Sequence, residues 1–300
     1  MAGELRSLTT PDGATLQYFI DEQAPADAAL LVYHHGTPAA GPLDTALLGA
    51  AREAGLVIAE LVRPGYGGST RAPGRTIADV APLVAALADH LGHDRFVTLG
   101  WSGGGPHALA TAALLPDRCA GALSLAGVGP YGEPDLDFLA GMGQDNIDEF
   151  GAALDGPGPL QAYLEVAAAG LADVTADEIV EQLRSLLPPV DQAAVTGQLG
   201  EEMAASLRWS VSTGIWGWFD DDIAFTLPWG FDLASIRVPV AIWQGGQDLM
   251  VPKEHGPWLA AHIPTAVPHL APDEGHISLV AQIGTGIAQV RDWLDDSRAL

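Results

Sequence analysis

Apolar residues along the chain fall into short blocks separated by turn residues, and their order predicts a mostly parallel sheet. Residues 5–9 and 14–20 alternate between polar and apolar positions and flank Pro11-Asp12-Gly13, which predicts a β-hairpin. Compact apolar runs then alternate with helical periodicity, which is the order of parallel strands joined by helices. The predicted strands cover 29–33, 56–62, 96–99, 122–126, 238–243 and 266–270, and the predicted helices cover 43–54, 77–90, 104–115, 257–261 and 278–297.

Residues 131–235 interrupt this alternation. They have helical periodicity punctuated by Pro and Gly, and no stretch among them has a convincing strand pattern. A segment of roughly 100 residues is long enough for a small subdomain. We therefore expect a helical cap (lid) at 131–235, inserted into a core made of residues 1–130 and 236–300.

The most informative motif follows the predicted strand 96–99. The sequence Gly100-Trp101-Ser102-Gly103-Gly104 matches G-x-S-x-G and runs directly into a predicted helix. A serine between a strand and a helix is typical of a nucleophile elbow. Gly100 and Gly104 remove side chains that would collide across so tight a turn, and the helix start favours negative charge near Ser102.

This elbow, the His35-Gly36 loop after the strand 29–33, and an Asp and a His later in the chain resemble the α/β-hydrolase superfamily. The resemblance covers nearly the whole chain. It implies an α/β-hydrolase fold, with a mostly parallel eight-stranded sheet, helices on both faces and an inserted helical cap. It also implies a capped serine hydrolase of an esterase-like or prolyl-aminopeptidase-like branch, without a cofactor.

A serine hydroxyl is a weak nucleophile near neutral pH, so it needs a histidine base, which in turn needs an acceptor for its second N–H. The superfamily's chain order implies Asp248, on the loop after the strand 238–243, and His276, just ahead of the last helix. Ser102, Asp248 and His276 are thus the predicted catalytic residues. The triplet Asp220-Asp221-Asp222 is expected to form a solvated face of the cap.

The tetrahedral intermediate of acyl transfer needs two hydrogen-bond donors for its oxyanion. The resemblance implies the backbone N–H of Gly103, which follows the nucleophile, and that of Thr37, in His35-Gly36-Thr37-Pro38. Gly36 lets the backbone approach a ligand. The loop 63–69 resembles the superfamily's loop after the fourth strand and is expected to act mostly as scaffolding.

The predicted cap ends in an aromatic cluster, most of which we expect to pack the cap against itself and the core. The cluster comprises Trp209, Trp216, Trp218, Phe219, Phe225, Trp229 and Phe231. The candidate substrate-binding residues are Gly36, Trp101, Trp216, Trp218 and Met250. An apolar lid over a serine triad favours a small to medium hydrophobic carboxylic ester, so we expect a carboxylesterase.

Other functions would use the same scaffold. A prolyl-type aminopeptidase would need acidic cap residues to receive a substrate ammonium, for which Glu201, Glu202 and Asp222 are candidates. A C–C hydrolase, a lactonase or a perhydrolase would use the same triad. A non-catalytic ligand receptor is the alternative from a different class, although it would have little need to retain all three triad residues.

Motifs for other chemistries are weak. Residues 127–132 match G-x-G-x-x-G, but Pro130 leaves no clean helix start to bind a pyrophosphate. The only lysine, Lys253, is not part of a phosphate-binding loop, and a single cysteine, Cys119, cannot build a Cys-rich zinc site. We therefore expect no metal site.

Charge and composition indicate which kinds of binding partner are disfavoured. The chain has 38 acidic and 13 basic residues, a net charge of −25, which disfavours nucleic acids and anionic membranes. Its 48% hydrophobic residues are enough for a large core. One cysteine cannot form an intramolecular disulfide, and no stretch is long and apolar enough for a membrane span, so we expect a cytoplasmic monomer or homodimer acting on a small molecule.

Overall fold

The computed structural model of the chain describes residues 3–25 and 27–298. Within them, eight strands form one sheet in the order β1-β2-β4-β3-β5-β6-β7-β8. The predicted hairpin of β1 and β2 is antiparallel, β2 also runs antiparallel to β4, and the remaining neighbours are parallel. The mostly parallel eight-stranded sheet is therefore confirmed. The strands are β1 (Glu4–Thr9), β2 (Thr15–Ile20), β3 (Ala29–His34), β4 (Leu56–Leu61), β5 (Phe96–Trp101), β6 (Cys119–Leu125), β7 (Val240–Gly245) and β8 (Ala266–Ala271).

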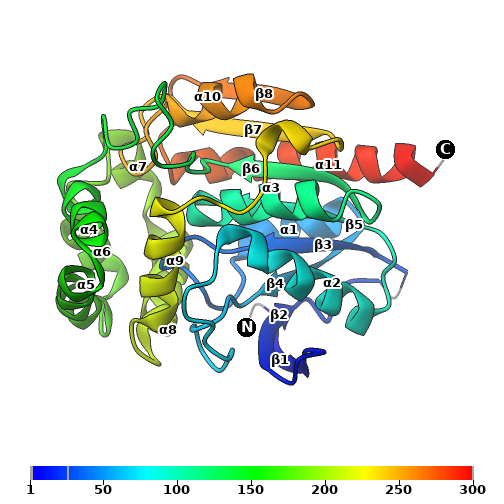
Figure 1. Cartoon of the computed structure of the whole chain (residues 1–300), viewed down its shortest axis with the longest axis horizontal. Coiled ribbons are helices and arrows are strands. Elements are labelled where there is room, and N and C mark those ends of the chain that lie inside the picture. The colour runs from blue at the N-terminus through cyan, green and yellow to red at the C-terminus, as the bar shows by residue number, and fades with distance from the viewer. Residues whose placement is uncertain (1–2, 26, 299–300) are drawn as a thin grey trace.

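Helices cover both faces of this sheet, with α2, α3 and α10 in front of it and α1 and α11 behind it in Figure 1. The central strands are apolar on both faces because both are covered. In β3, for example, Leu31 packs into the core on one face, while Leu30 and Val32 pack into the core on the other. These helices are α1 (Thr45–Glu53), α2 (Val80–Leu91), α3 (Gly105–Leu114), α10 (His255–His262) and α11 (Ile283–Arg298).

Three predicted helices begin as tighter 3-10 turns. Ile77–Asp79 precedes α2, Ser102–Gly104 precedes α3, and Ser278–Gln282 precedes α11. Short 3-10 turns are common at helix ends, and periodicity alone does not separate them from the α-helix that follows. The sequence therefore located these helices but not their first turns.

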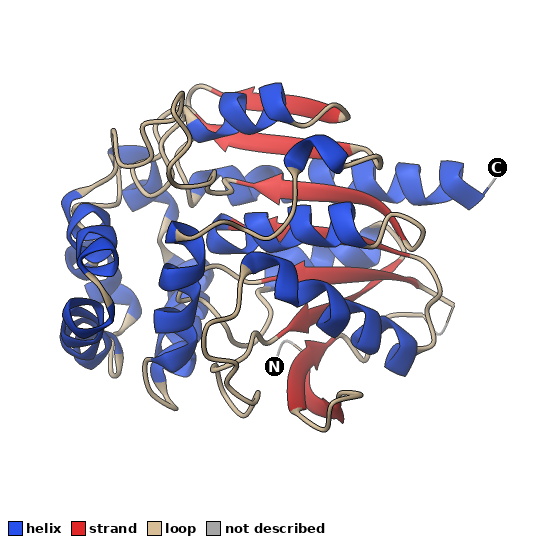
Figure 2. Ribbon diagram, viewed as in Figure 1, coloured by secondary structure: helices blue, strands red, loops and turns tan. Residues whose placement is uncertain are grey.

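A layer of helices lies beyond one end of the sheet, and the strand arrows in Figure 2 point toward it. Residues 131–235 contain these helices and no strand. Side chains that leave the carboxyl ends of the parallel strands thus lie under this layer, which we call the helical layer. It consists of α4 (Gln144–Asp155), α5 (Pro157–Leu171), α6 (Ala176–Gln182), α7 (Pro189–Ala194), α8 (Gly197–Val211) and α9 (Trp216–Thr226). The 3-10 turn Leu233–Ser235 instead contacts α3.

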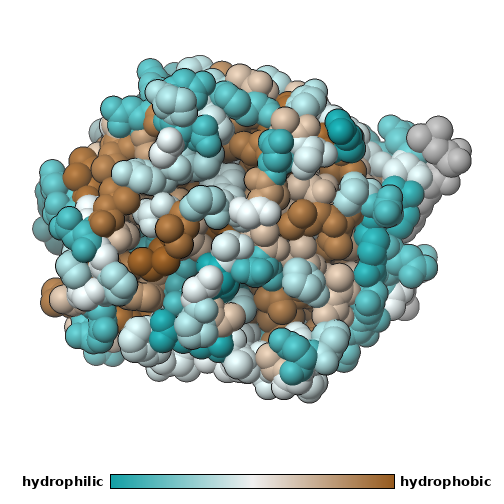
Figure 3. Space-filling view, in the orientation of Figure 1, coloured by the Kyte–Doolittle hydropathy of each residue, from teal (hydrophilic) through white to brown (hydrophobic). Residues whose placement is uncertain are grey.

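The surface is mixed in character. Figure 3 shows hydrophobic residues gathered mainly toward the side of the helical layer, within a largely hydrophilic surround. Val166 and Leu154, on α5 and α4, are among the large apolar side chains exposed to solvent. Over the described part of the chain, no helix has the length and hydropathy needed to cross a membrane.

Candidate active site

Ser102 occupies a strained turn between β5 and α3. Its φ is 55°, in the left-handed region that residues with a Cβ rarely adopt. A side chain at Gly100 would collide with the carbonyl of Gly104, and one at Gly104 would collide with the carbonyl of His34. The two glycines are therefore needed to bring the strand and the helix this close together, as the G-x-S-x-G pattern predicts.

Asp248 and His276 meet although they lie 28 residues apart in the chain. His276 Nδ1 lies 2.8 Å from Asp248 Oδ2. The other carboxylate oxygen, Asp248 Oδ1, accepts the backbone N–H groups of Met250 and Val251, both at 2.8 Å. Because a carboxylate only accepts hydrogen bonds, Nδ1 carries the proton and Nε2 keeps a free lone pair.

His276 is buried beside Trp101, whose ring stacks on the imidazole with the centroids 5.6 Å apart. Burial by itself would lower the pKa of His276, but the charge and the hydrogen bond of Asp248 raise that pKa above its usual value. Asp248 thus stabilises the imidazolium that forms when His276 acts as a base and takes up a proton.

Ser102 and His276 line one cavity of about 520 Å³ between the sheet and the helical layer. Among the described residues, no hydrogen bond joins Ser102 Oγ to the His276 ring. Hydrogen bonds between a nucleophile and its base are often long or misaligned before a substrate binds. The cavity therefore brings together two of the three predicted catalytic residues, and the third, Asp248, supports His276 from behind.

The loop after β3 lies directly against the elbow. A side chain at Gly103 would collide with Thr37, and one at Gly36 would lie 3.6 Å from the Cβ of Ser102. Gly36, Thr37 and Gly103 all line the cavity beside Ser102. The structure thus gathers the two residues whose backbone N–H groups are predicted to bind the oxyanion.

Comparisons with known proteins agree with this fold. A family model described as alpha/beta hydrolase fold matches residues 29–147. An α/β-hydrolase fold protein from Chitinophaga pinensis has a TM-score of 0.67 and 18% identity, with 98% of each chain covered. The chain has the α/β-hydrolase fold.

Two further solved structures carry the same α/β-hydrolase fold. A thermophilic esterase from Thermogutta terrifontis has a TM-score of 0.61 and 20% identity, with 98% of each chain covered. An enol-lactonase from Burkholderia xenovorans has a TM-score of 0.61 and 21% identity, covering 97% of this chain and 100% of that chain. A search of curated proteins finds no match to the sequence.

The acidic triplet was expected to form a solvated face of the cap, and this prediction is wrong. Asp220, Asp221 and Asp222 are only 3%, 0% and 1% exposed. They lie on α9, within the helical layer, and each has a different environment. Asp220 pairs with the Arg71 guanidinium at 2.8 Å, Asp221 enters a buried ionic network, and Asp222 lines the cavity. A run of charges in the sequence therefore does not predict solvation, because packing of the helix buried all three carboxylates and gave arginine partners to only Asp220 and Asp221.

Asp221 connects α9 to the loop that holds Thr37. Its Oδ2 accepts hydrogen bonds from Thr37 Oγ1 at 2.8 Å and from Arg63 at 2.6 Å. Arg75 reaches Oδ1 at 2.5 Å, and the Tyr66 hydroxyl also donates to Oδ2. Burial would raise the pKa of Asp221, but the two guanidinium groups lower it well below its usual range.

Arg63 carries this connection into the backbone of the Thr37 loop. Its guanidinium donates to the carbonyls of His35 at 2.5 Å and Gly36 at 2.8 Å, and to Thr37 Oγ1 at 2.9 Å. Arg63 is fully buried, so these bonds are not weakened by water. Arg63, at the start of the loop 63–69, thus supports the loop of Thr37 through these hydrogen bonds.

Asp191 holds the loop of His276, and sequence reasoning missed it. This fully buried aspartate lies on α7, and its carboxylate accepts the backbone N–H groups of His276, Ile277 and Ser278 at 2.8, 3.0 and 2.9 Å. Only the sequence Pro188-Pro189-Val190-Asp191, a plausible helix start, marks the position. Nothing in it indicates a partner 85 residues away.

We predict that Asp191→Asn lowers kcat by up to about 10²-fold, because the amide cannot accept all three N–H groups and the His276 loop shifts. The loss of accepted hydrogen bonds should also cost about 1–3 kcal/mol of unfolding free energy. Steady-state kinetics and thermal unfolding measure both effects. Asp177→Asn, at an exposed aspartate of α6, is the matched control, and equal kinetics for the two variants would contradict the role of Asp191.

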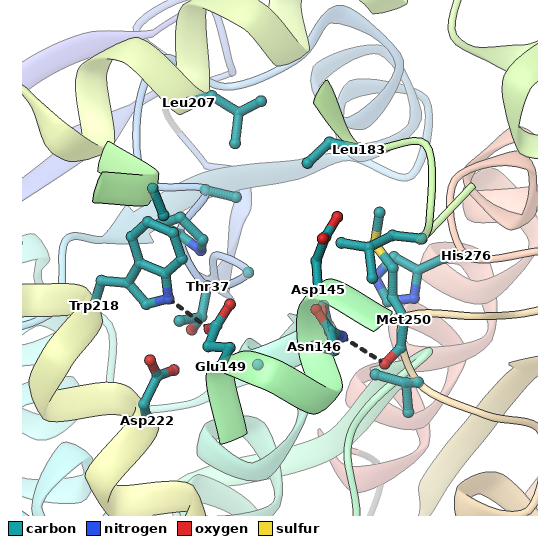
Figure 4. Close-up of a pocket in the computed structure, with 18 of the residues that line it drawn as sticks. Thr37, Asp145, Asn146, Glu149, Leu183, Leu207, Trp218, Asp222, Met250 and His276 are labelled. Carbon is teal, nitrogen blue, oxygen red and sulfur yellow. Dashed lines mark hydrogen bonds between the residues drawn. The ribbon is translucent and has the colours of Figure 1, made fainter. Parts of the chain in front are cut away.

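The cavity wall contains most of the predicted substrate-binding residues. Gly36, Trp101, Trp218 and Met250 line it, together with Phe225 from the aromatic cluster. Figure 4 shows Trp218 and Met250 on opposite sides of the cavity, with His276 behind Met250. The remaining wall is mostly aliphatic, which suits an apolar group on a substrate.

Trp216 does not line this cavity. Its ring is 37% exposed, lies 4.0 Å from the Arg71 guanidinium carbon and contacts Phe219 edge to face. Other members of the aromatic cluster are structural as well. Trp209 packs edge to face on Phe19, with the ring centroids 5.3 Å apart. Trp216 and Trp218 point to different sides of α9. The sequence does not show which side of this helix faces the cavity, so it could not distinguish the two residues.

Proposed function

We propose that this protein is a serine hydrolase that cleaves a small to medium carboxylic ester with a hydrophobic group. The observation that carries the proposal is the 2.8 Å contact of His276 Nδ1 with Asp248, because it leaves Nε2 free in the cavity that also contains Ser102. The strained φ of Ser102 and the mostly apolar cavity wall support the same proposal.

In the acylation step, His276 Nε2 takes the proton of Ser102 Oγ as the oxygen attacks the ester carbonyl carbon. The negative charge that develops on the carbonyl oxygen is bound by the backbone N–H groups of Thr37 and Gly103. His276 then gives its proton to the departing alkoxide, so an alcohol leaves and the acyl group remains on Ser102.

In the deacylation step, His276 removes a proton from water, which attacks the acyl carbon, and returns that proton to Ser102 Oγ as the acid leaves. Asp248 holds the imidazole in orientation and stabilises its positive charge in both steps. The helical layer covers the cavity and limits the access of water that would weaken these electrostatic interactions.

Two assays test the proposal together. A fluorophosphonate probe should add its phosphonyl group to Ser102, seen by mass spectrometry of the intact protein and its peptides. Purified protein should also hydrolyse p-nitrophenyl acyl esters, tested over rising acyl length beside amino-acid p-nitroanilides as amide substrates. Absence of both the adduct and ester turnover would instead favour a non-catalytic ligand receptor. Turnover confined to the anilides would favour an aminopeptidase.

A further inference from the structure

Two carboxyl groups from different helices meet in the wall of the cavity. Glu149 comes from α4 and Asp222 from α9, and both line the cavity that contains Ser102. Figure 4 shows them on the side of Trp218, across the cavity from Met250. They are close enough to share a hydrogen bond when one of them is protonated.

These carboxyl groups lack a positively charged partner. Trp218 Nε1 donates to Glu149 Oε1 at 2.7 Å, but neither oxygen of Asp222 has a donor among the described residues, although Asp222 is 1% exposed. No lysine or arginine lines the cavity. Arg75 has a small lowering effect on the pKa of Asp222, but its guanidinium pairs with Asp221.

The surrounding charges make this environment more negative. Asp145 and Asp148 lie on α4 with Glu149, Asp221 adjoins Asp222, and Tyr163 adds a neutral phenol. Loss of hydration, with the neighbouring carboxylates, raises the pKa of Glu149 to about 7 and that of Asp222 well above its usual value. The pair therefore retains a proton near neutral pH, and further ionisation would leave an uncompensated charge.

We propose that Glu149 and Asp222 form a cation subsite that binds a protonated amine of the substrate. The inference rests on the proposed function, because the amine would belong to the ester whose carbonyl reaches Ser102. An ammonium group supplies N–H donors to the unpartnered oxygens of Asp222 and a positive charge beside this carboxyl pair.

The other walls also suit an organic cation. Trp218, Phe225, Phe150 and Tyr163 line the cavity, and aromatic faces attract ammonium groups. A metal ion fits less well, since no cluster of three or more His, Cys, Asp or Glu residues in the described chain is arranged to hold one. The apolar remainder of the cavity would hold the carbon chain that joins the amine to the ester.

Proton linkage distinguishes a cation from a neutral ligand. A cation binds best when Glu149 is ionised, so its affinity should rise as the pH increases through the Glu149 pKa of about 7. A neutral hydroxyl ligand would instead use the protonated pair as a donor, and its affinity would stay constant or fall over the same range. A primary alkylamine remains protonated from pH 6 to 8, so the change reports on groups of the protein. His276 also lines the cavity and has a raised pKa, and the Glu149→Gln variant separates its contribution from that of Glu149.

The test is calorimetric titration of the wild-type protein and of Ser102→Ala with hexylammonium chloride and with 1-hexanol. At pH 8, hexylammonium should bind at least ten times more tightly than 1-hexanol. Between pH 8 and pH 6, its affinity should fall by about tenfold, as a pKa near 7 requires. Equal affinities for the two ligands, or a hexylammonium affinity that does not change with pH, would overturn the proposal without any variant.

Asp222→Asn and Glu149→Gln should each remove most of the preference for hexylammonium. Asp148→Asn is the matched control, because this exposed carboxylate of α4 does not line the cavity and is bonded to Gln144. Thermal unfolding checks that each variant is folded. If both cavity variants still bound hexylammonium more tightly than 1-hexanol, the cation would bind at another site and the proposed subsite would be overturned.

Binding and turnover separate the two proposals. Binding of hexylammonium requires no reaction. If the protein bound hexylammonium but hydrolysed no ester, the proposed function would be overturned and the cation subsite would stand. Conversely, hydrolysis of p-nitrophenyl heptanoate with the same KM as p-nitrophenyl 6-aminohexanoate would support the hydrolase and count against the cation subsite.

Discussion

Ser102→Ala is expected to lower kcat/KM for a p-nitrophenyl ester by about 10⁴-fold or more, because the variant has no oxygen to form the acyl-enzyme. What activity remains would come from the oxyanion donors and from substrate binding. The midpoint of thermal unfolding should hardly change. Alanine has the same Cβ as serine, so the left-handed backbone at φ 55° is strained to a similar extent in both proteins.

Ser124→Ala provides the matched control for this result. Ser124 is the buried neighbour of Gly100 in the adjacent strand β6, and its Oγ has no hydrogen-bond partner within residues 3–25 and 27–298. The same chemical change at this position should leave kcat/KM within a few-fold of wild type. Undiminished ester hydrolysis by Ser102→Ala would contradict the assignment of the nucleophile, whatever the control shows.

Asp221→Asn is expected to cost about 3–5 kcal/mol of unfolding free energy, since it leaves the charges of Arg63 and Arg75 buried without their carboxylate. It should also lower kcat of the folded protein by up to about 10²-fold, because Arg63 and Thr37 lose the partner that holds the oxyanion-binding loop. Denaturant unfolding measures the first effect, and kinetics at a temperature where the variant is folded measure the second.

The neighbouring Asp220→Asn is a close control on the same helix. Its partner Arg71 has 30% of its side chain exposed, so the loss of this ion pair should cost about 0–1 kcal/mol. If the two asparagine variants had equal free energies of unfolding, the buried ionic network of Asp221 would not stabilise the fold as we infer. If Asp221→Asn lost stability but kept full kcat, the network would support the fold without positioning the loop.

Much of the candidate site can be predicted from the sequence because it depends on local motifs. The turn around Ser102 needs glycines at fixed spacing, since backbone atoms of nearby residues occupy the space where side chains would be. His276 and Asp248 follow successive strands of a parallel sheet, whose carboxyl ends lie at one edge. The chain order of the elements therefore placed these three residues in one neighbourhood, as the contact of His276 with Asp248 illustrates.

The contacts of the helical layer could not be predicted from the sequence, because its residues bind partners that are distant in the chain. Asp221 binds Thr37 across 184 residues, and Asp191 binds the backbone of His276 across 85. The pattern of an acidic triplet is the same whether arginines or water surround it. Only the packing of α9 against the core buried these carboxylates and gave each of them a different environment.

The sequence by itself determined the strands, most of the helices and the elbow of Ser102, because strand periodicity, helical periodicity and glycine spacing are local properties of the chain. The candidates Asp248 and His276 came from its resemblance to the α/β-hydrolases. The tertiary structure alone decided that Trp218 faces the cavity while Trp216 faces solvent, that Asp191 supports the His276 loop, and that Glu149 meets Asp222. These outcomes depend on how the helices of the layer rotate and pack over the sheet, and burial then sets the charge and pKa of each group.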